Sequence, residues 1–272
     1  MDCRNGPLNL DRRQFGIGAL GLLLASRAEA QTLSAAALMA ASHEATRFIS
    51  ARFAATLTIQ SRGGTVQKRE LAGMTKLVDG GASTARLLRF SSPGDMRGVA
   101  TLTVERREKG DDLWLYLPAF RRVRRLVSAN RADPWVGSDF SLGDVTGHKP
   151  GDWRHSLVGA ETLGSADCWR IDSVPGTRGT ATDTGYSRRT SWIRKADSAL
   201  VRCNFFDLSG TLLKSHVAED LRLLDPARRK VQSMRVTMRN MRSGGVTTMA
   251  FSSFRANVAV GDAELAPNAL SG

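Results

Sequence analysis

The chain of 272 residues contains none of the local motifs that mark the common enzyme classes. It has no G-x-S-x-G elbow for a serine nucleophile, no phosphate-binding loop, and no cysteine placed with a histidine as an activated nucleophile. Two acid pairs, Asp111-Asp112 and Glu219-Asp220, fall at predicted turns, where aspartate is favoured for backbone reasons alone. We therefore predict that the protein is not an enzyme. An envelope hydrolase with an unrecognised site is the alternative that a spatial grouping of residues would support.

Histidine is also scarce, with four in the chain, and none of them belongs to a metal-binding motif. The sequence His43-Glu44 begins like the zinc motif H-E-x-x-H, but Arg47 stands where the second imidazole is required. Three further histidines have no local partner at ligand spacing: His148, His155 and His216. We predict no metal and no cofactor.

Long apolar runs are absent outside the first thirty residues. Those thirty residues are basic, then apolar, then small: Arg4, Arg12 and Arg13, the run 15–26, and Ala28-Glu29-Ala30. This order is typical of a cleavable export signal, and the twelve-residue run is too short to span a bilayer as a permanent helix. The sequence therefore predicts that residues 1–30 are a leader.

The leader predicts the compartment of the protein. Arg12-Arg13 followed by Gln14-Phe15 resembles a twin-arginine signal, whose substrates fold before export, and an ordinary secretory signal is the alternative. Either route leads to the bacterial periplasm, with cleavage after about Ala30. Residues 31–272 then have the length of one β-rich domain.

Acidic residues are outnumbered, and the excess of positive charge limits the partners. The chain has 39 Lys and Arg against 26 Asp and Glu, a net charge of +13. Loss of the leader removes four arginines and three acids, which leaves +12. In the periplasm such a field favours an anionic membrane surface, of phospholipid or lipopolysaccharide, and we predict no nucleic-acid partner.

The apolar periodicity changes once along the chain. Helical spacing from Leu33 to about Phe53 predicts one amphipathic helix, and from Ala55 the period becomes two. Further strands are predicted at about 65–78, 83–91, 98–107, 112–117, 121–127, 155–161, 166–174, 185–195, 199–207, 211–217, 230–241 and 246–255. No helical pattern separates these strands, so we predict a mainly β, antiparallel and strongly curved sheet. The helix and the loop 129–152 are available to cover its concave face.

Two cysteines follow the leader, and the strand assignment decides whether they can form a bridge. Cys168 and Cys203 lie on predicted strands separated by the strand 185–195. If the strands pair in sequence order, two strand spacings of about 9.5 Å exceed the roughly 7 Å limit between the Cα atoms of a disulfide. We predict no disulfide for that order, and a non-sequential order would reverse the prediction.

The strand at 113–117 is apolar on both faces. Leu113, Leu115 and Leu117 point to one side, and Trp114 and Tyr116 point to the other. A strand of this kind needs cover on both sides. One face belongs in the core, and the other either lines a cavity beneath the helix or packs directly against it.

Four arginines follow this strand after Pro118, which ends the strand. Arg121 and Arg125 share one face of the return strand, and Arg122 and Arg124 share the other. Two interpretations are about equal on these residues alone. The arginines either protect an exposed sheet edge or form a cationic rim at the mouth of an apolar pocket, suited to an amphiphile whose phosphate stays outside.

These motifs resemble those of the outer-membrane lipoprotein-sorting protein family, relatives of the LolA and LolB carriers. The resemblance is carried, in order, by Met96-Arg97-Gly98, the segment 111–125, Gly137-Ser138-Asp139-Phe140 with Asp144-Val145, and more weakly by the ending 260–265. The chain departs from the family pattern at Leu265, where an aromatic residue is common, and after Phe140, where Ser-Leu replaces a Thr/Ser-Tyr pair.

The resemblance implies a half-open, strongly curved antiparallel β-barrel covered by a few helices, without catalysis. It also implies a hydrophobic cavity that shields the acyl chains of a lipoprotein or another amphiphilic lipid on the way to the outer membrane. Members with this motif pattern often occur beside RND-type exporters, so an inner-membrane RND-type transporter is an implied partner. An envelope adaptor or stress sensor of the same fold, binding a protein, is the alternative.

From the strand pattern and the resemblance together we predict thirteen ligand-binding residues: Met96, Arg97, Leu113, Trp114, Leu115, Tyr116, Leu117, Arg121, Arg122, Arg124, Arg125, Asp139 and Phe140. Flexible thioethers adapt to ligands of several shapes, although core filling is the more common task of a methionine. The candidates are Met74, Met96, Met234, Met238, Met241 and Met249.

Overall fold

Thirteen antiparallel strands form one sheet in the computed structural model, which describes residues 34–106, 110–126 and 131–271. The strands are β1 (Ser50–Gln60), β2 (Val66–Val78), β3 (Ser83–Ser92), β4 (Ala100–Val104), β5 (Asp112–Leu117), β6 (Arg122–Arg125), β7 (Trp153–Leu163), β8 (Ala166–Pro175), β9 (Arg188–Arg194), β10 (Leu200–Phe206), β11 (Leu212–Asp225), β12 (Lys230–Asn240) and β13 (Val246–Ala256). The predicted export signal at 1–30 lies outside the described residues.

The strand order shows how the two halves of the chain build the sheet. The order is β6-β5-β4-β3-β2-β1-β13-β12-β11-β10-β9-β8-β7. The first six strands run outward from the centre to one edge, the chain then crosses to the opposite edge, and the last seven strands return. β13 pairs with β1, with Ala256 opposite Ala51. Among the described strands β6 and β7 do not pair, so the curved sheet stays half open, as predicted.

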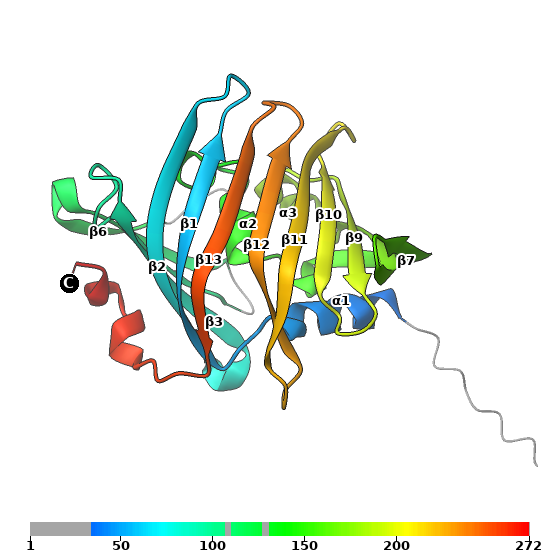
Figure 1. The fold of residues 1–272 in the computed structure, drawn as a ribbon, viewed down its shortest axis with the longest axis horizontal. Helices are drawn as coiled ribbons and strands as arrows, with labels where there is room; N and C mark the ends of the chain where they lie inside the picture. The colour runs from blue at the N-terminus through cyan, green and yellow to red at the C-terminus, as the bar shows by residue number, and fades with distance from the viewer. Residues whose placement is uncertain (1–33, 107–109, 127–130, 272) are drawn as a thin grey trace, which may run out of the picture. The chain divides into compact units, whose positions relative to one another are not determined.

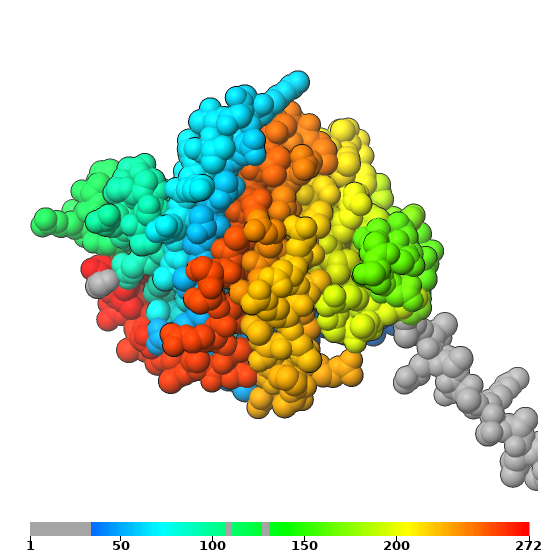
Figure 2. Space-filling model, viewed as in Figure 1, coloured from blue at the N-terminus to red at the C-terminus, as the bar shows by residue number. Residues whose placement is uncertain are grey.

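Three α-helices in the described part of the chain lie on one side of this sheet. They are α1 (Ala35–Ala45), α2 (Leu142–Thr146) and α3 (Arg178–Thr184). Figure 1 shows them behind the strands, and Figure 2 shows that strands of both halves form the opposite surface. Helix α1 contacts β7, β9 and β12. Helix α1 and the segment that leads from β6 to β7 thus cover the same face of the sheet, as predicted. The described part of that segment, residues 131–152, is called the crossing segment below. No helix among the described residues is long and apolar enough to span a membrane.

The structure corrects the predicted helix boundaries. Helix α1 ends at Ala45, and β1 has begun by Ser50, so the predicted extension to Phe53 is wrong. Ala45, Phe48 and Ile49 continue the helical spacing. The Phe48 ring nevertheless packs on Phe254 of β13 with centroids 5.2 Å apart, and Phe53 of β1 packs on the same ring at 5.8 Å. Cross-strand packing outweighs the local pattern here. Helices α2 and α3 were not predicted, because five and seven residues are too few to show a helical period.

The sheet has a separate core on each face. On the helical side, Trp135 and Phe140 of the crossing segment and Trp153 of β7 pack with other sheet residues such as Leu57 and Phe90. On the other side of β3–β6, the C-terminal segment is packed against the strands through Val260, Leu265 and Leu270. Strand β5 is therefore packed against apolar residues on both faces.

The two cysteines are buried and unbonded, which confirms the prediction of no disulfide. β9 separates β8 from β10, as the sequence order required. Cys203 packs in the helical-side core, and Cys168 packs in a different cluster with Trp192 and Val201.

Candidate ligand cavity

A cavity of about 420 Å³ lies between the sheet and its covering helices. Pockets that enclose one small-molecule ligand span about 300–1,000 Å³. Its apolar wall comes from α1, the crossing segment and both halves of the sheet: Met39, Phe48, Phe53, Leu71, Leu77, Leu88, Phe140, Val145, Ala199, Leu200, Phe205, Ala218, Leu221, Val236, Met238, Met249, Phe251 and Phe254. Because these residues are far apart in the sequence, only the closure of β1 against β13 brings them together.

One wall of the cavity is aromatic and depends on a glycine. The Phe53 ring contacts those of Phe251 and Phe254, with centroids 5.4 and 5.8 Å away. It lies directly over Gly73 of β2, where a Cβ atom would sit 2.4 Å from Cζ of Phe53. Any side chain at Gly73 would therefore displace this ring.

Two of the candidate methionines, Met238 and Met249, line the cavity beside these rings. The other candidates have other positions. Met74 packs in the second core, Met96 packs against the helical-side core, Met234 is buried, and Met241 is exposed.

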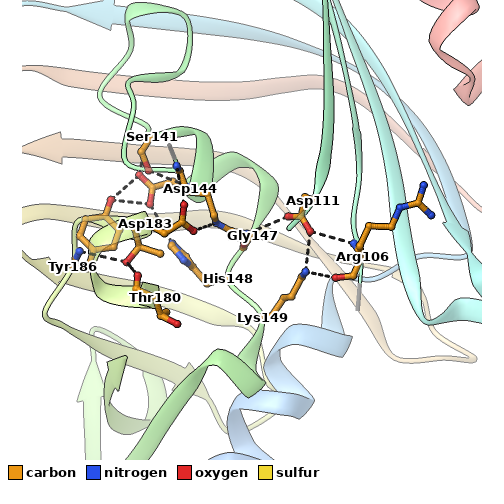
Figure 3. A network of polar contacts seen from close by, with 12 residues as sticks. Arg106, Asp111, Ser141, Asp144, Gly147, His148, Lys149, Thr180, Asp183 and Tyr186 are labelled. Carbon is orange, nitrogen blue, oxygen red and sulfur yellow. Dashed lines mark hydrogen bonds and ion pairs between the residues drawn. The ribbon is translucent and has the colours of Figure 1, made fainter. Parts of the chain in front are cut away.

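The polar part of the cavity centres on Asp144, whose side chain is 2% exposed. Asp144 lies in the first turn of α2, where its carboxylate accepts from the backbone N–H of Ser141 at 2.8 Å and forms a capping box. It also accepts from the Tyr186 hydroxyl at 3.0 Å, from Nε2 of His148 at 3.3 Å and from Nζ of Lys214 at 3.1 Å. Figure 3 shows Asp144 facing Tyr186 and Ser141. All of its acceptor capacity is thus used within the protein.

These contacts set the charges around Asp144. Burial alone would raise the pKa of Asp144, but the contacts with His148 and Lys214 outweigh it and hold the pKa well below its usual range. Burial lowers the pKa of His148 to about 4, so the ring is neutral at pH 7. Burial also raises the pKa of Tyr186, which stays a hydroxyl donor. Asp144 and Lys214 are then a compensated ion pair among neutral neighbours.

A second anchor holds the segment that carries α2. Asp111, which precedes β5, accepts from Nζ of Lys149 at 2.8 Å and from the guanidinium of Arg131 at 3.1 Å. Arg131 also donates to the carbonyl of Gly147. Figure 3 shows Lys149 reaching Asp111 beside Arg106. Asp111, one of the two acids of the 111–125 motif, thus fixes the crossing segment over the cavity.

A buried arginine lies on the same wall as this cluster. Arg189 of β9 lines the cavity with 5% of its surface exposed, and its guanidinium carbon lies 3.9 Å from the ring centroid of Trp153. In the register of the sheet it is opposite Phe205, which lines the cavity from β10. Burial lowers the pKa of Arg189 without making a guanidinium neutral at pH 7.

Of the thirteen predicted ligand-binding residues, Phe140 lines the cavity. Met96, Leu115 and Leu117 pack against the helical-side core without reaching the cavity wall, and Leu113 is buried. Trp114 and Tyr116 pack in the second core, beneath the C-terminal segment. The interpretation in which one face of strand 113–117 lines a cavity is therefore wrong. The face with Trp114 and Tyr116 is covered by the C-terminal segment.

The predicted polar residues lie away from the cavity. Arg97, Arg121, Arg122, Arg124 and Arg125 are exposed. Arg125 pairs with the buried Asp112, and Arg124 lies over the Phe120 ring. Asp139 accepts from the hydroxyl of Thr247 at 2.7 Å and ties the crossing segment to β13.

The sequence offered no sign of most of the cavity's polar residues. His148, Tyr186, Arg189 and Lys214 come from separate segments, and alternation along β9 does not tell which face is inside. One signal was available, because Ser141 and Asp144 have the spacing of a capping box.

Comparisons with known proteins agree with this architecture. The model of a family described as an uncharacterized protein matches residues 82–271. A DUF1329 family protein from Desulfovibrio piger is 24% identical, covers 87% of this chain and 97% of its own, and has a TM-score of 0.80. A domain from Vibrio parahaemolyticus named for outer membrane lipoprotein sorting is 21% identical, with 88% and 98% covered and a TM-score of 0.79.

A LolA superfamily protein from Nitrosomonas europaea is 18% identical, with 86% and 98% covered and a TM-score of 0.65. At these identities the three likenesses show a shared fold. No curated protein matches the chain.

Proposed function

The chain belongs to the DUF1329-like family, and from this premise we propose that it is a non-catalytic carrier that encloses the apolar chain of an amphiphilic lipid or lipoprotein. The chain of the cargo lies in the cavity between the sheet and the helices α1 and α2. The proposal extends to periplasmic transport toward the outer membrane, in keeping with the predicted leader.

The observation that carries this proposal is the cavity and its largely apolar wall. Protein interiors are normally packed without voids much larger than a water molecule, and an empty apolar space forfeits contacts on all its walls. A cavity of about 420 Å³ lined by phenylalanine, leucine and methionine is therefore costly unless it is used. Each methylene that a ligand buries there contributes about 0.8 kcal/mol, so a long acyl chain supplies ample affinity.

The names of the fold neighbours support the same class of cargo. The Vibrio domain is named for lipoprotein sorting, and the Nitrosomonas protein belongs to the LolA superfamily. We extend this to the present chain because most of its cavity wall is apolar.

The exposed arginines of the β5–β6 edge fit a separate step of such a cycle. Arg122 and Arg124 make no ion pair among the described residues. We propose that this edge contacts the anionic membrane surface, where each basic residue contributes about 1 kcal/mol. An RND-type transporter is the proposed membrane partner.

A pair of matched variants tests the carrier function. Ala218 of β11 lines the cavity, so Ala218→Phe should fill it, whereas Ala250→Phe adds the same volume on β13 beside two cavity residues and outside the wall. Displacing two methylenes of ligand should weaken binding of a fluorescent long-chain probe about tenfold in Ala218→Phe. Ala250→Phe should bind like the parent protein.

Lipid extraction of the purified protein, followed by mass spectrometry, gives a second measure. Bound amphiphile is expected in the parent protein and depleted in Ala218→Phe. Absence of lipid together with failure to bind the probe would overturn the carrier proposal and direct attention to a protein-binding role for the fold.

A further inference from the structure

Arg189 is a buried cation without an acidic partner. Within the residues that the structure describes, no carboxylate lies in ion-pair distance of Arg189, and its Nε has no hydrogen-bond acceptor. Its contact is with the face of Trp153, 3.9 Å from the guanidinium carbon. An aromatic face offsets only part of the cost of removing a guanidinium from water.

The charges near Arg189 do not neutralise it. The nearest acid of the cluster, Asp144, is already bonded to Ser141, Tyr186, His148 and Lys214. Lys214 cancels the charge of Asp144, and the rings of His148 and Tyr186 are uncharged at pH 7. One positive charge is left over on this wall of the cavity.

Other charged groups on the cavity wall are remote or already matched. Arg86 donates to the carbonyl of Val145, and Glu105 is the acid whose charge acts on Arg86 and on His43. Arg131, which acts on Arg189 by repulsion, is itself paired with acids of two other segments. These groups leave the excess charge at Arg189 unchanged.

Further polar atoms on the wall are unpaired. The hydroxyl of Thr146 and Nδ1 of His216 are buried, line the cavity and have no hydrogen-bond partner among the described residues. Both can donate a proton to a ligand oxygen. A ligand that carries oxygen atoms would satisfy groups that an all-apolar chain leaves bare.

We propose that Arg189 binds the acidic head group of the cargo inside the cavity, so that the carrier selects an amphiphile with a single negative charge. The proposal rests on the carrier function and names its cargo class: a long-chain carboxylate or phosphate monoanion. The planar fork of a guanidinium matches the oxygens of either group. In this proposal the head group lies inside the cavity, beside Arg189. The alternative from the sequence was a rim formed by the arginines of the β5–β6 edge, which would hold the head group outside the cavity.

Ligands that share one chain and differ only in the head group test this. Hexadecanoate, its methyl ester and hexadecyl methyl phosphate, a phosphodiester with one negative charge, are titrated into the purified protein by calorimetry. A charge-assisted hydrogen bond in a buried site should make the two acids bind about 10- to 100-fold more tightly than the ester. The acid that binds more tightly identifies which of the two head groups the site prefers.

The variant Arg189→Gln should remove the preference for the acids over the ester. Arg189→Lys should restore part of the preference, because it restores the charge without the fork. Arg202→Gln is the matched control: Arg202 lies on the adjacent strand, is over Trp192 at 5.2 Å and does not line the cavity. Thermal melting of each variant establishes that it is folded.

The outcomes separate the two proposals. If acids and ester bind equally, or if Arg189→Gln keeps the preference for acids, the head-group proposal is overturned and the carrier proposal stands. If none of the three ligands binds the parent protein, the carrier proposal fails first. Loss of the preference in Arg202→Gln to the same extent would also overturn the assignment to Arg189, since it would indicate a general field effect.

Discussion

The β5–β6 edge and the wall around Arg189 place arginines in opposite surroundings. At the edge, Arg122 and Arg124 are exposed, and water solvates their charge at little cost. On the cavity wall, Arg189 is 5% exposed and forms no ion pair with any acid in the part of the chain that the structure describes. The dense cluster of arginines in this sequence lies on the surface. Arg189, which no sequence motif distinguishes, is the arginine whose burial without an acidic partner is costly.

The same contrast applies to the acids of the two regions. Asp144→Asn should destabilise the protein by about 3–5 kcal/mol, because it leaves the nearly buried Lys214 without its counter-charge. Asp112→Asn should cost about 1–2 kcal/mol, since its partners Arg106 and Arg125 are partly exposed and can be solvated. Urea unfolding measures both. Equal losses of unfolding free energy in Asp144→Asn and Asp112→Asn would show that the ion pairs of the cavity and of the edge are shielded from water to the same extent.

As the pH falls, titration of the cavity histidines should lower the free energy of unfolding before the carboxylates of the β5–β6 edge begin to titrate. The pKa of His148 is about 4 in the folded protein and about 6.5 when unfolded, so the unfolded chain binds more protons between these values. Stability should then fall as the pH drops from about 6.5 to 4, by on the order of 2–3 kcal/mol for His148. Burial gives His216 the same direction, also with a pKa of about 4.

The measurement is the urea midpoint between pH 4 and 7. His148→Gln should lower the slope in this range by about half, because His216 contributes with the same sign. Asp144 does not contribute there, because its folded pKa lies far below the unfolded value of 3.8 and its stabilisation is lost only at lower pH. A profile that keeps its slope in His148→Gln would contradict the assignment.

The edge arginines should show a smaller effect, and on membranes rather than on the cavity. Arg122→Ala with Arg124→Ala should lower affinity for vesicles containing anionic phospholipid by about 2 kcal/mol and leave binding of a long-chain ligand unchanged. Arg235→Ala with Arg239→Ala, two exposed arginines of β12, is the matched control. Co-sedimentation measures the difference. If both double variants lost the same vesicle affinity, the β5–β6 edge would contribute only through the overall positive charge of the protein.

Much of the architecture could be predicted because the strands alternate clearly. Residues 66–78, 83–92 and 112–117 form strands almost at the predicted boundaries. The helix was extended too far, because Phe48 and Ile49 continue the helical spacing and only the packing of Phe48 and Phe53 on Phe254 shows that the helix has ended. Short helices such as α2 depend on a cap and on tertiary packing rather than on a repeating pattern.

The cavity was much harder to predict than the strands. The strand 113–117 was correctly interpreted as apolar on both faces, but the residues that cover its second face come from the C-terminal segment, some 140 residues later. Phe140 is the predicted ligand-binding residue that lines the cavity. The residues of the Asp144 cluster lie up to 70 positions apart, so no local spacing could relate them.

Alternation and composition along the chain are enough to predict the antiparallel curved sheet, the opening helix and the excess of positive charge, whereas the unbonded cysteines also required that the strands pair in sequence order. Only the tertiary structure decided which arginine is buried and where the empty space lies. The physical reason is that burial and charge compensation depend on the pairing of β1 with β13 and on the path of the crossing segment. These long-range contacts place Arg189 and Asp144 on the cavity wall, with the Arg189 guanidinium against Trp153, and leave the edge arginines exposed.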